Sequence, residues 1–325
     1  MAVTQGRLTT VGIGKESTFG TAVSRTNWIK VDTTTGLTES QSIEPIPHHR
    51  HGGSTNPAFV DYHAGDVALE GSMGGPLLYD GCGLLIQTAF GAAVSSSGAG
   101  PYTHTYNLGT NVDSLTLEII RGTSGNSEIL VGCCIRTFSI IIEQGKYARW
   151  EADFICQKAN ADRSSAGTPS FTAFNGANLV GNSIKGHQAA ALSWNSAAYA
   201  IHSRITYSLD RKLTGIRALG SKYIAEVVAG DYASLSVQVD RMDNGDALYN
   251  GHRAVTQSDL TQAITGTGNL AGTFTARNAV ISNDSADIPN AGPIVERVVF
   301  MPFSDDTDNA LTIAITNDSS SGTAN

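Results

Sequence analysis

A cluster of histidines is the first feature of the sequence that could do chemistry. His48, His49 and His51 lie close together and His63 follows nearby, and neutral imidazole is a good ligand for zinc or nickel. Successive side chains of an extended chain point to opposite sides, so His49 and His51 could share a face while His48 could not. Because no Asp or Glu joins them, we interpret His48–Asn56 as a solvated polar loop and expect no metal site.

A second segment has the composition of a phosphate-binding loop without its spacing. The full pattern requires a glycine five residues before Gly14 and a serine or threonine directly after Lys15. The chain has Thr9 and Glu16 at these positions. The segment that begins at Gly12 is therefore not predicted to bind phosphate.

Two acidic segments could be mistaken for cation sites. Asp240–Asp246 resembles a calcium-binding loop, but its third position is Met242 and its twelfth is Gly251, where the loop requires oxygen ligands. We interpret this segment as a turn between a strand and a helix. Asp305–Asp308 is interpreted as a hairpin turn.

The sequence contains no set of residues that would support nucleophilic catalysis. It has no Gly-x-Ser-x-Gly motif. The four cysteines lack Cys-x-x-Cys spacing, and Cys133 and Cys134 lie in an apolar run of strand length, which indicates buried small hydrophobic residues. The other two are Cys82 and Cys156. We expect no catalytic residue, no cofactor and no metal, and therefore a protein that is not an enzyme.

Composition favours a large β-rich protein. Of 325 residues, 35 are glycine, 41% are hydrophobic and only 15% are charged, a balance typical of strands joined by many turns. The net charge is −8, and both halves of the chain are acidic, which argues against a basic surface that holds nucleic acid. No apolar stretch approaches the length of a membrane helix, and residues 1–10 lack the pattern of a signal peptide.

Alternating hydrophobic residues predict strands in both halves of the chain. In the first half they lie at 28–32, 66–73, 114–121, 128–143 and 146–157, with a turn at Gly145. In the second half they lie at 190–194, 203–209, 234–239, 272–281, 294–303 and 310–316. A short helix is predicted over Pro76–Phe90, with proline at its start and Gly91 after its end.

The two halves also share an order of short motifs, which predicts an internal duplication. Ala64-Gly-Asp66 is followed by Leu77-Leu-Tyr-Asp-Gly81, and Ala229-Gly-Asp231 is followed by Ala247-Leu-Tyr-Asn-Gly251. The expected organisation is an N-terminal arm (1–26), a first domain (27–158), a connector (159–186), a second domain (187–318) and a C-terminal tail (319–325).

Several motifs together resemble the major tail tube proteins of long, non-contractile-tailed bacteriophages. These are Gly12-Ile-Gly-Lys-Glu-Ser-Thr-Phe-Gly-Thr-Ala22 followed by Trp28-Ile-Lys-Val31, Ala64-Gly-Asp-Val-Ala-Leu-Glu-Gly71, Pro76-Leu-Leu with Phe90-Gly91, Tyr102-Thr-His-Thr-Tyr106 and Val131-Gly-Cys-Cys-Ile-Arg-Thr-Phe-Ser139. The resemblance covers residues 10–158 well and the second half more loosely. The second half lacks the Gly-Lys-Glu and Tyr-Thr-His motifs.

The resemblance implies a mainly β fold, with β-sandwich or β-barrel domains of tail-tube type flanked by a short helix. It implies a structural virion protein whose rings stack into a hollow tube, the conduit for DNA ejection. A duplicated chain would form trimeric rings of pseudo-sixfold shape, whereas an unduplicated one would form hexamers. The implied partners are a tape-measure protein, a tail terminator and distal tail or baseplate proteins. DNA would pass without specific binding, no membrane would be bound, and assembly would occur in the host cytoplasm.

Two other functions fit parts of the sequence. A secretion-system or contractile-tail inner tube would have the same architecture with sixfold rings and no duplication. A β-sandwich adhesin or carbohydrate-binding module could use Trp28, Trp150 and Trp194 as stacking platforms. With only 7% aromatic residues and the three tryptophans far apart, packing in the core is the better interpretation of these side chains.

Overall fold

The structure is a computed structural model. It describes residues 10–46, 61–120, 127–160, 183–199, 203–242, 247–287, 295–304 and 309–318. The described chain is mainly β, as predicted, with two short α-helices and one short 3-10 helix, η3 (Gly186–Gln188). The elements of the first part are β1 (Thr10–Lys15), β2 (Asn27–Lys30), β3 (Thr33–Ile46), β4 (Asp61–Pro76), α1 (Gly83–Phe90), β5 (Ser95–Ser97), β6 (Tyr102–Asn107), β7 (Leu115–Ile120), β8 (Ser127–Glu143), β9 (Arg149–Cys156) and β10 (Lys158–Ala159).

The remaining elements follow η3. They are β11 (Leu192–Trp194), β12 (Ala197–Tyr199), β13 (Arg204–Asp210), β14 (Thr214–Arg217), β15 (Ile224–Val228), β16 (Ser234–Met242), α3 (Ala247–Arg253), β17 (Gln257–Thr265), β18 (Ala271–Asp287), β19 (Val295–Met301) and β20 (Leu311–Asn317). We call β1–β9 the first half and β11–β19 the second half.

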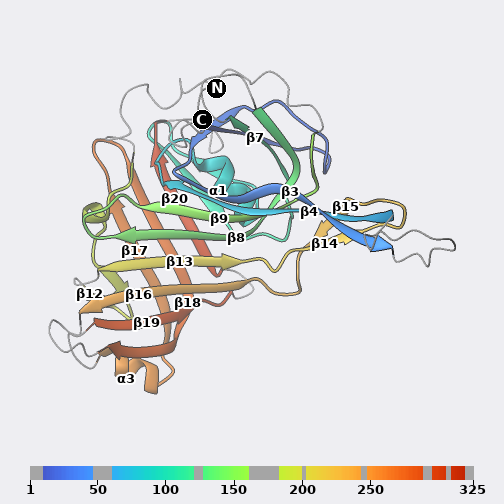
Figure 1. Ribbon diagram of the computed structural model, residues 1–325. Coiled ribbons are helices and arrows are strands. Elements are labelled where there is room, and N and C mark those ends of the chain that lie inside the picture. Colours follow the sequence, from blue (N-terminus) through green and yellow to red (C-terminus); the bar gives the residue numbers. More distant parts are fainter. Residues whose placement is uncertain are drawn as a thin grey trace, which may run out of the picture.

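One antiparallel sheet runs through both halves. Its strands pair in the order β3, β4, β9, β8, β13, β16, β19 and β18, and Figure 1 shows most of them lying side by side. Burial alternates along β13 and β20, with every second residue in the core, as expected for strands that cover a core with one face. The periodicity that predicted these strands is therefore the periodicity of their packing.

The long strands β8 and β18 each belong to two layers. The N-terminal part of β8 pairs with β7 and its C-terminal part with β9, and β18 pairs with β17 and β19 in the same way. In each strand a β-bulge lies near the start of the C-terminal part, at Arg136 and at Ser282. Bulges bend a strand and increase its twist, which lets one strand pass from one layer to the next around the core.

The largest side chains fill the space between these layers. Trp150, Trp194, Phe154 and Phe300 are almost fully buried, and the Trp194 and Phe300 rings meet edge to face with centroids 5.5 Å apart. Aromatic pairs in this geometry contribute about 1 kcal/mol beyond their burial. Trp28 is buried as well, so none of the tryptophans forms an exposed stacking platform.

The predicted helix is shorter than expected. Residues up to Pro76 belong to β4, and α1 begins only at Gly83 because Gly81 has a positive φ of 101° that a helix cannot include. The predicted end is confirmed, since Gly91 adopts the left-handed conformation and its N–H bonds to the Gln87 carbonyl. The second-half motif Ala247–Gly251 lies within α3 itself.

Residues 10–26 do not form part of an N-terminal arm, which corrects that expectation. β1 pairs with both β2 and β7, and its Val11 and Ile13 side chains are fully buried. The alternation in β1 was hidden by glycines at positions 12 and 14, which contribute no hydrophobic side chain. Residues 1–9 and the tail at 319–325 lie outside the described part of the chain.

Candidate assembly surfaces

The histidine cluster does not form a site in the described structure. His48, His49 and His51 lie outside the described residues, and His63 is exposed on β4. Among the residues that the structure describes, no three His, Cys, Asp or Glu side chains could together hold a metal ion. Asp305–Asp308 also lies outside the described part. Asp240 lies in β16, where its Oδ1 is 3.0 Å from the Arg297 guanidinium.

The four cysteines are buried and unpaired, as predicted. Burial raises the pKa of the Cys82 and Cys134 thiols to about 12. A nucleophilic cysteine requires a thiolate and access to substrate. Cys82 and Cys134 have neither, and all four cysteines pack as small hydrophobic side chains.

The Gly-Lys-Glu motif holds the first half together. Lys15 pairs with Asp113 at 2.7 Å, and the buried Glu16 carboxylate accepts four hydrogen bonds. They come from the Ser114 hydroxyl (2.7 Å) and from the Thr116 hydroxyl and the N–H groups of Gly20 and Gly132 (2.9 Å each). A carboxylate so surrounded stabilises the loop that carries it. The motif is therefore structural.

The two halves repeat the same set of strand pairings. In the first half β1 pairs with β2 and β7, β4 with β3 and β9, and β8 with β7 and β9. In the second half β11 pairs with β12 and β17, β16 with β13 and β19, and β18 with β17 and β19. Every pairing is antiparallel. The order of the strands along the chain is also the same.

Irregular features recur at matching positions. The β7–β8 bulge skips Thr116, and the β17–β18 bulge skips Asp259. Opposite them, Gly132 and Asn278 both have a positive φ, of 64° and 49°. Conformations of this kind are rare for side-chain-bearing residues, so their recurrence fixes the alignment of β8 with β18 to the residue.

The halves are joined at β8 and β13. Seven residues of β13, Arg204–Asp210, pair with Glu143–Thr137 of β8, and the hydroxyls of Ser139 and Ser208 lie 3.3 Å apart across the joint. In the described chain the edge of β18 that matches Thr137–Ile141, Asn283–Asp287, pairs only with β19, and β3 pairs only with β4. Within the described residues, the sheet therefore ends in two open strand edges that match the two sides of its internal joint.

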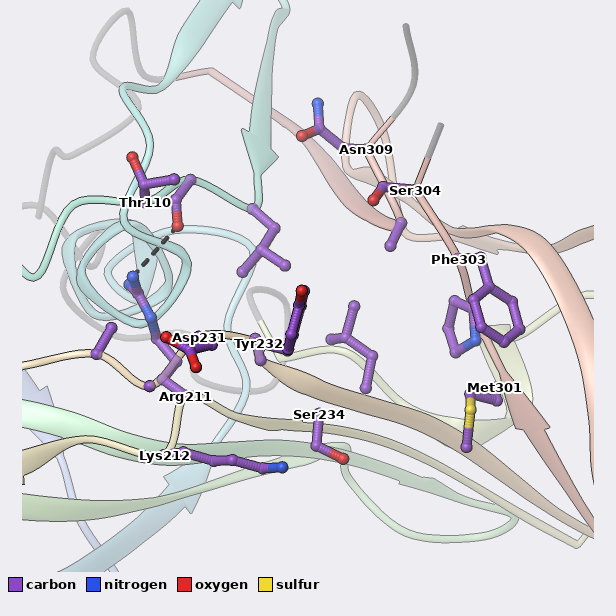
Figure 2. A pocket seen from close by; sticks show the side chains of 18 residues that line it. Thr110, Arg211, Lys212, Asp231, Tyr232, Ser234, Met301, Phe303, Ser304 and Asn309 are labelled. Carbon is purple, nitrogen blue, oxygen red and sulfur yellow. Dashed lines mark hydrogen bonds between the residues drawn. The ribbon is translucent and has the colours of Figure 1, made fainter. Parts of the chain in front are cut away.

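A surface pocket of about 620 Å³ lies where the second half meets the residues that follow β6 (Figure 2). It lies between the residues that follow β6, β13 and β19 and the segment that leads into β16. Tyr232, Met301 and Phe303 are hydrophobic lining residues with large exposed areas. Figure 2 shows Met301 and Phe303 together on one wall and Tyr232 opposite them.

Arg211 forms the polar base of this pocket. Its guanidinium is buried and donates to the carbonyls of Ala89 at 3.4 Å and Gly109 at 3.2 Å. Ala89 lies in the last turn of α1, where a cation compensates the helix dipole. Burial lowers the pKa of Arg211, and the nearby Asp113 opposes that shift. Arg211 thus fixes a first-half helix to a second-half strand.

The comparison with protein families identifies the chain. The family model described as phage tail tube protein matches residues 6–302. The chain belongs to the phage tail tube protein family. No curated protein was found to match the chain.

Membership of the phage tail tube family makes the chain a structural component of the virion that self-assembles into a tube with other tail proteins. In the described part of this tail tube protein, neither α-helix is long and apolar enough to cross a bilayer. The surfaces that matter are therefore those on which copies meet, namely the open edges and the pocket.

Sequence reasoning did not find these surfaces. The strand β3 was missed because residues 39–45 are all exposed and show no alternation. The strands β14 and β15 were missed because they are only four and five residues long. The motif Ala64-Gly-Asp66, matched at Ala229-Gly-Asp231, was the available signal. It lies at the base of the β3–β4 hairpin and of the β14–β15 hairpin.

Proposed function

We propose that three copies of the chain form a closed ring with six equivalent sheet segments, and that such rings stack into the tail tube of a long, non-contractile-tailed phage. The observation that carries this proposal is the β8–β13 joint. It connects one half to the next through strand edges that recur, unpaired in the described chain, at the two ends of the sheet. A head-to-tail contact of this kind produces a ring when its rotation closes.

The matching registers define the proposed contact between chains. The alignment of β8 with β18 places Ser285 where Ser139 lies, and the alignment of β13 with β3 places Thr38 where Ser208 lies. The edge of β18 at Asn283–Asp287 would then pair with the Thr35–Ser40 edge of the next copy. Open edges that would promote aggregation in a monomer become the joints of a closed ring.

The assembled tube would be the conduit for DNA ejection. A chain of net charge −8 supports passage of DNA without binding, because binding to phosphate requires clustered Lys and Arg. The proposed partners are a tape-measure protein, a tail terminator and distal tail proteins, and assembly would take place in the host bacterial cytoplasm. The repeated pairings support two tube domains. The first would end at residue 158 and the second would begin at residue 187. The protein would act without catalysis or a cofactor.

Electron microscopy with image averaging of the concentrated protein, and of particles that contain it, tests this function. We expect stacked hollow rings with threefold symmetry and a six-lobed outline. Strict sixfold rings would contradict the three-copy arrangement and favour the organisation of a contractile-tail or secretion-system inner tube. A protein that stays monomeric, in particles without a tube, would contradict the tube itself.

A substitution at the open edge tests the joint directly. Ser285→Lys places a long charged side chain where a short hydroxyl is required, and it should abolish tube formation while the monomer melts at an unchanged temperature, because Ser285 is exposed. The matched control is Thr273→Lys, an exposed position of the same strand where both edges are already paired, with β17 and β20. Normal tubes from the Ser285 variant would refute the proposed joint.

A further inference from the structure

We infer that the pocket beside Phe303 receives the β3–β4 hairpin of the next copy in the ring. This inference rests on the proposed ring and names a second contact between neighbouring copies. The hairpin consists of the outer parts of β3 and β4, Ser40–Ile46 and Asp61–Asp66. It extends from the body of the molecule (Figure 1).

The corresponding contact already exists inside one chain. The β14–β15 hairpin of the second half packs on a first-half surface that contains Cys134 and Ile155, and it covers that surface with Leu213, Ile224 and Val227. These five side chains form one buried cluster. A hydrophobic patch in the first half is therefore covered by a hairpin from the second half.

Three hydrogen bonds, each accepted by a backbone carbonyl, fix this hairpin in place. The N–H of Val67 donates to the Lys222 carbonyl at 2.9 Å, and the Arg217 guanidinium donates to the Val67 carbonyl at 2.9 Å. The side-chain amide of Gln157 donates to the Ile224 carbonyl at 2.9 Å. The contact thus combines apolar burial with polar bonds at its rim, as protein interfaces do.

The pocket contains the second-half equivalents of that covered patch. The common register of β8–β9 and β18–β19 aligns Ile155 with Met301 and Gln157 with Phe303. The bond from the Gln157 N–H to the Val131 carbonyl recurs as the bond from the Phe303 N–H to the Arg277 carbonyl. Ile155 is 5% exposed, whereas Met301 is 44% exposed. The second-half patch lacks the cover that the first-half patch has.

The β3–β4 hairpin carries the equivalents of the covering residues. Pro45 pairs with Tyr62 as Gly215 pairs with Val227, so the two hairpins share one register. Tyr62 then occupies the position of Val227, and Ile43, two residues before Pro45, occupies the position of Leu213.

Exposure separates these equivalent side chains sharply. Val227 and Leu213 are 7% and 6% exposed, whereas Tyr62 and Ile43 are 64% and 65% exposed. One molecule therefore presents an uncovered patch and, on another part of its surface, an uncovered hairpin with matching apolar side chains. The internal contact shows how they fit, and a second copy of the chain would cover both exposed surfaces. Burial of these side chains on assembly would stabilise the ring.

Cysteine cross-linking tests the contact. Full-length Tyr62→Cys and Phe303→Cys proteins are prepared separately, mixed under assembly conditions and treated with a short bismaleimide. The native cysteines are buried, so the unsubstituted protein gives the background. We expect a covalent dimer at least tenfold above background in the mixture and not in either variant alone. A chain with both substitutions should give a ladder that ends at three chains. Leu219→Cys, at a fully exposed position in the loop between β14 and β15, replaces Tyr62→Cys as the matched control and should give background only.

The outcomes separate this contact from the ring. Rings in the microscope without a cross-link between positions 62 and 303 would overturn the hairpin contact and leave the tube intact. A cross-linked dimer without any ring would support the hairpin contact and contradict the proposed function. Absence of both would overturn both. Because Tyr62 and Phe303 have large exposed areas, an unchanged melting temperature of each variant excludes misfolding as the cause of a negative result.

Discussion

Replacement of Glu16 by glutamine should destabilise the first half by about 3 kcal/mol. The carboxylate accepts two hydrogen bonds on each oxygen, one from a backbone N–H and one from a hydroxyl. Glutamine keeps one oxygen, so its NH₂ group must face the N–H of either Gly20 or Gly132. A hydroxyl can rotate and become an acceptor, but an amide N–H cannot.

The magnitude follows from this arrangement. A buried N–H without an acceptor costs about 1–3 kcal/mol, and each hydrogen bond that loses the negative charge becomes weaker by about 1 kcal/mol. The lower cost of burying a neutral amide offsets part of this loss. The net expectation is about 3 kcal/mol.

The second half provides the matched control. There the N–H of Asn278, the equivalent of Gly132, donates to Asp259 at 3.0 Å. Asp259 also pairs with Arg277, and both side chains are 39% exposed. Water can replace a lost bond at such a site, so Asp259→Asn should cost about 1 kcal/mol or less.

Urea denaturation and hydrogen exchange measure these effects. The free energy of unfolding is compared for the two variants and the unsubstituted protein, and exchange is followed in the peptide that contains Gly132. Protection of that peptide should fall in the Glu16 variant only. A Glu16→Gln protein as stable as the unsubstituted one, or as the Asp259 variant, would refute the argument that the four hydrogen bonds stabilise the loop.

Two further substitutions test buried charges. Burial raises the pKa of Asp80 to about 6, so the folded state binds the proton more tightly than the unfolded one, and stability should fall as the pH rises from about 4 to about 6. Solvent screens this half-buried site, so the stability lost between these pH values should be about 1–2 kcal/mol, and Asp80→Asn should abolish that loss. If the unsubstituted protein and the variant lose the same stability over this pH range, the prediction is wrong. Arg241 and Glu296 form a buried ion pair, so Glu296→Gln should destabilise the protein by about 3–5 kcal/mol because it removes the carboxylate that pairs with the buried Arg241 charge. A loss below 1 kcal/mol in urea denaturation would show that water reaches the pair.

The sequence predicted strands best where one face of the strand is buried. Along β13 and β20 the burial alternates residue by residue, and hydrophobic periodicity detects that pattern directly. It fails for β3, whose outer part has no buried face in a single copy. If that part packs only when copies meet, its pattern reflects contacts that are absent from one molecule.

Short motifs predicted the internal repeat but not the reason for its differences. The second half lacks Gly-Lys-Glu because its β11–β12 connection is a two-residue turn, with Asn195 and Ser196 both at positive φ. That turn leaves no room for a residue like Glu16. Asp259, at the position of Thr116, supplies the carboxylate instead. The equivalent N–H groups of Gly132 and Asn278 thus each bond to a carboxylate, that of Glu16 in the first half and that of Asp259 in the second. This equivalence could be found only from the strand registers.

Covalent connection of the two halves explains why one hairpin and one patch are buried while their equivalents are exposed. Within a chain the second-half hairpin is always near the first-half patch, so its effective concentration is high and the contact forms on folding. In the described part of the chain, the Ile43 and Tyr62 side chains of the first-half hairpin stay largely exposed. In the proposed ring the first-half hairpin meets its patch only on the next copy, so each chain would offer one hairpin and one patch on different parts of its surface.

Two such chains are complementary without being symmetric, which favours head-to-tail growth over isolated two-fold dimers. The same rotation that relates the halves, continued from chain to chain, would then close the ring.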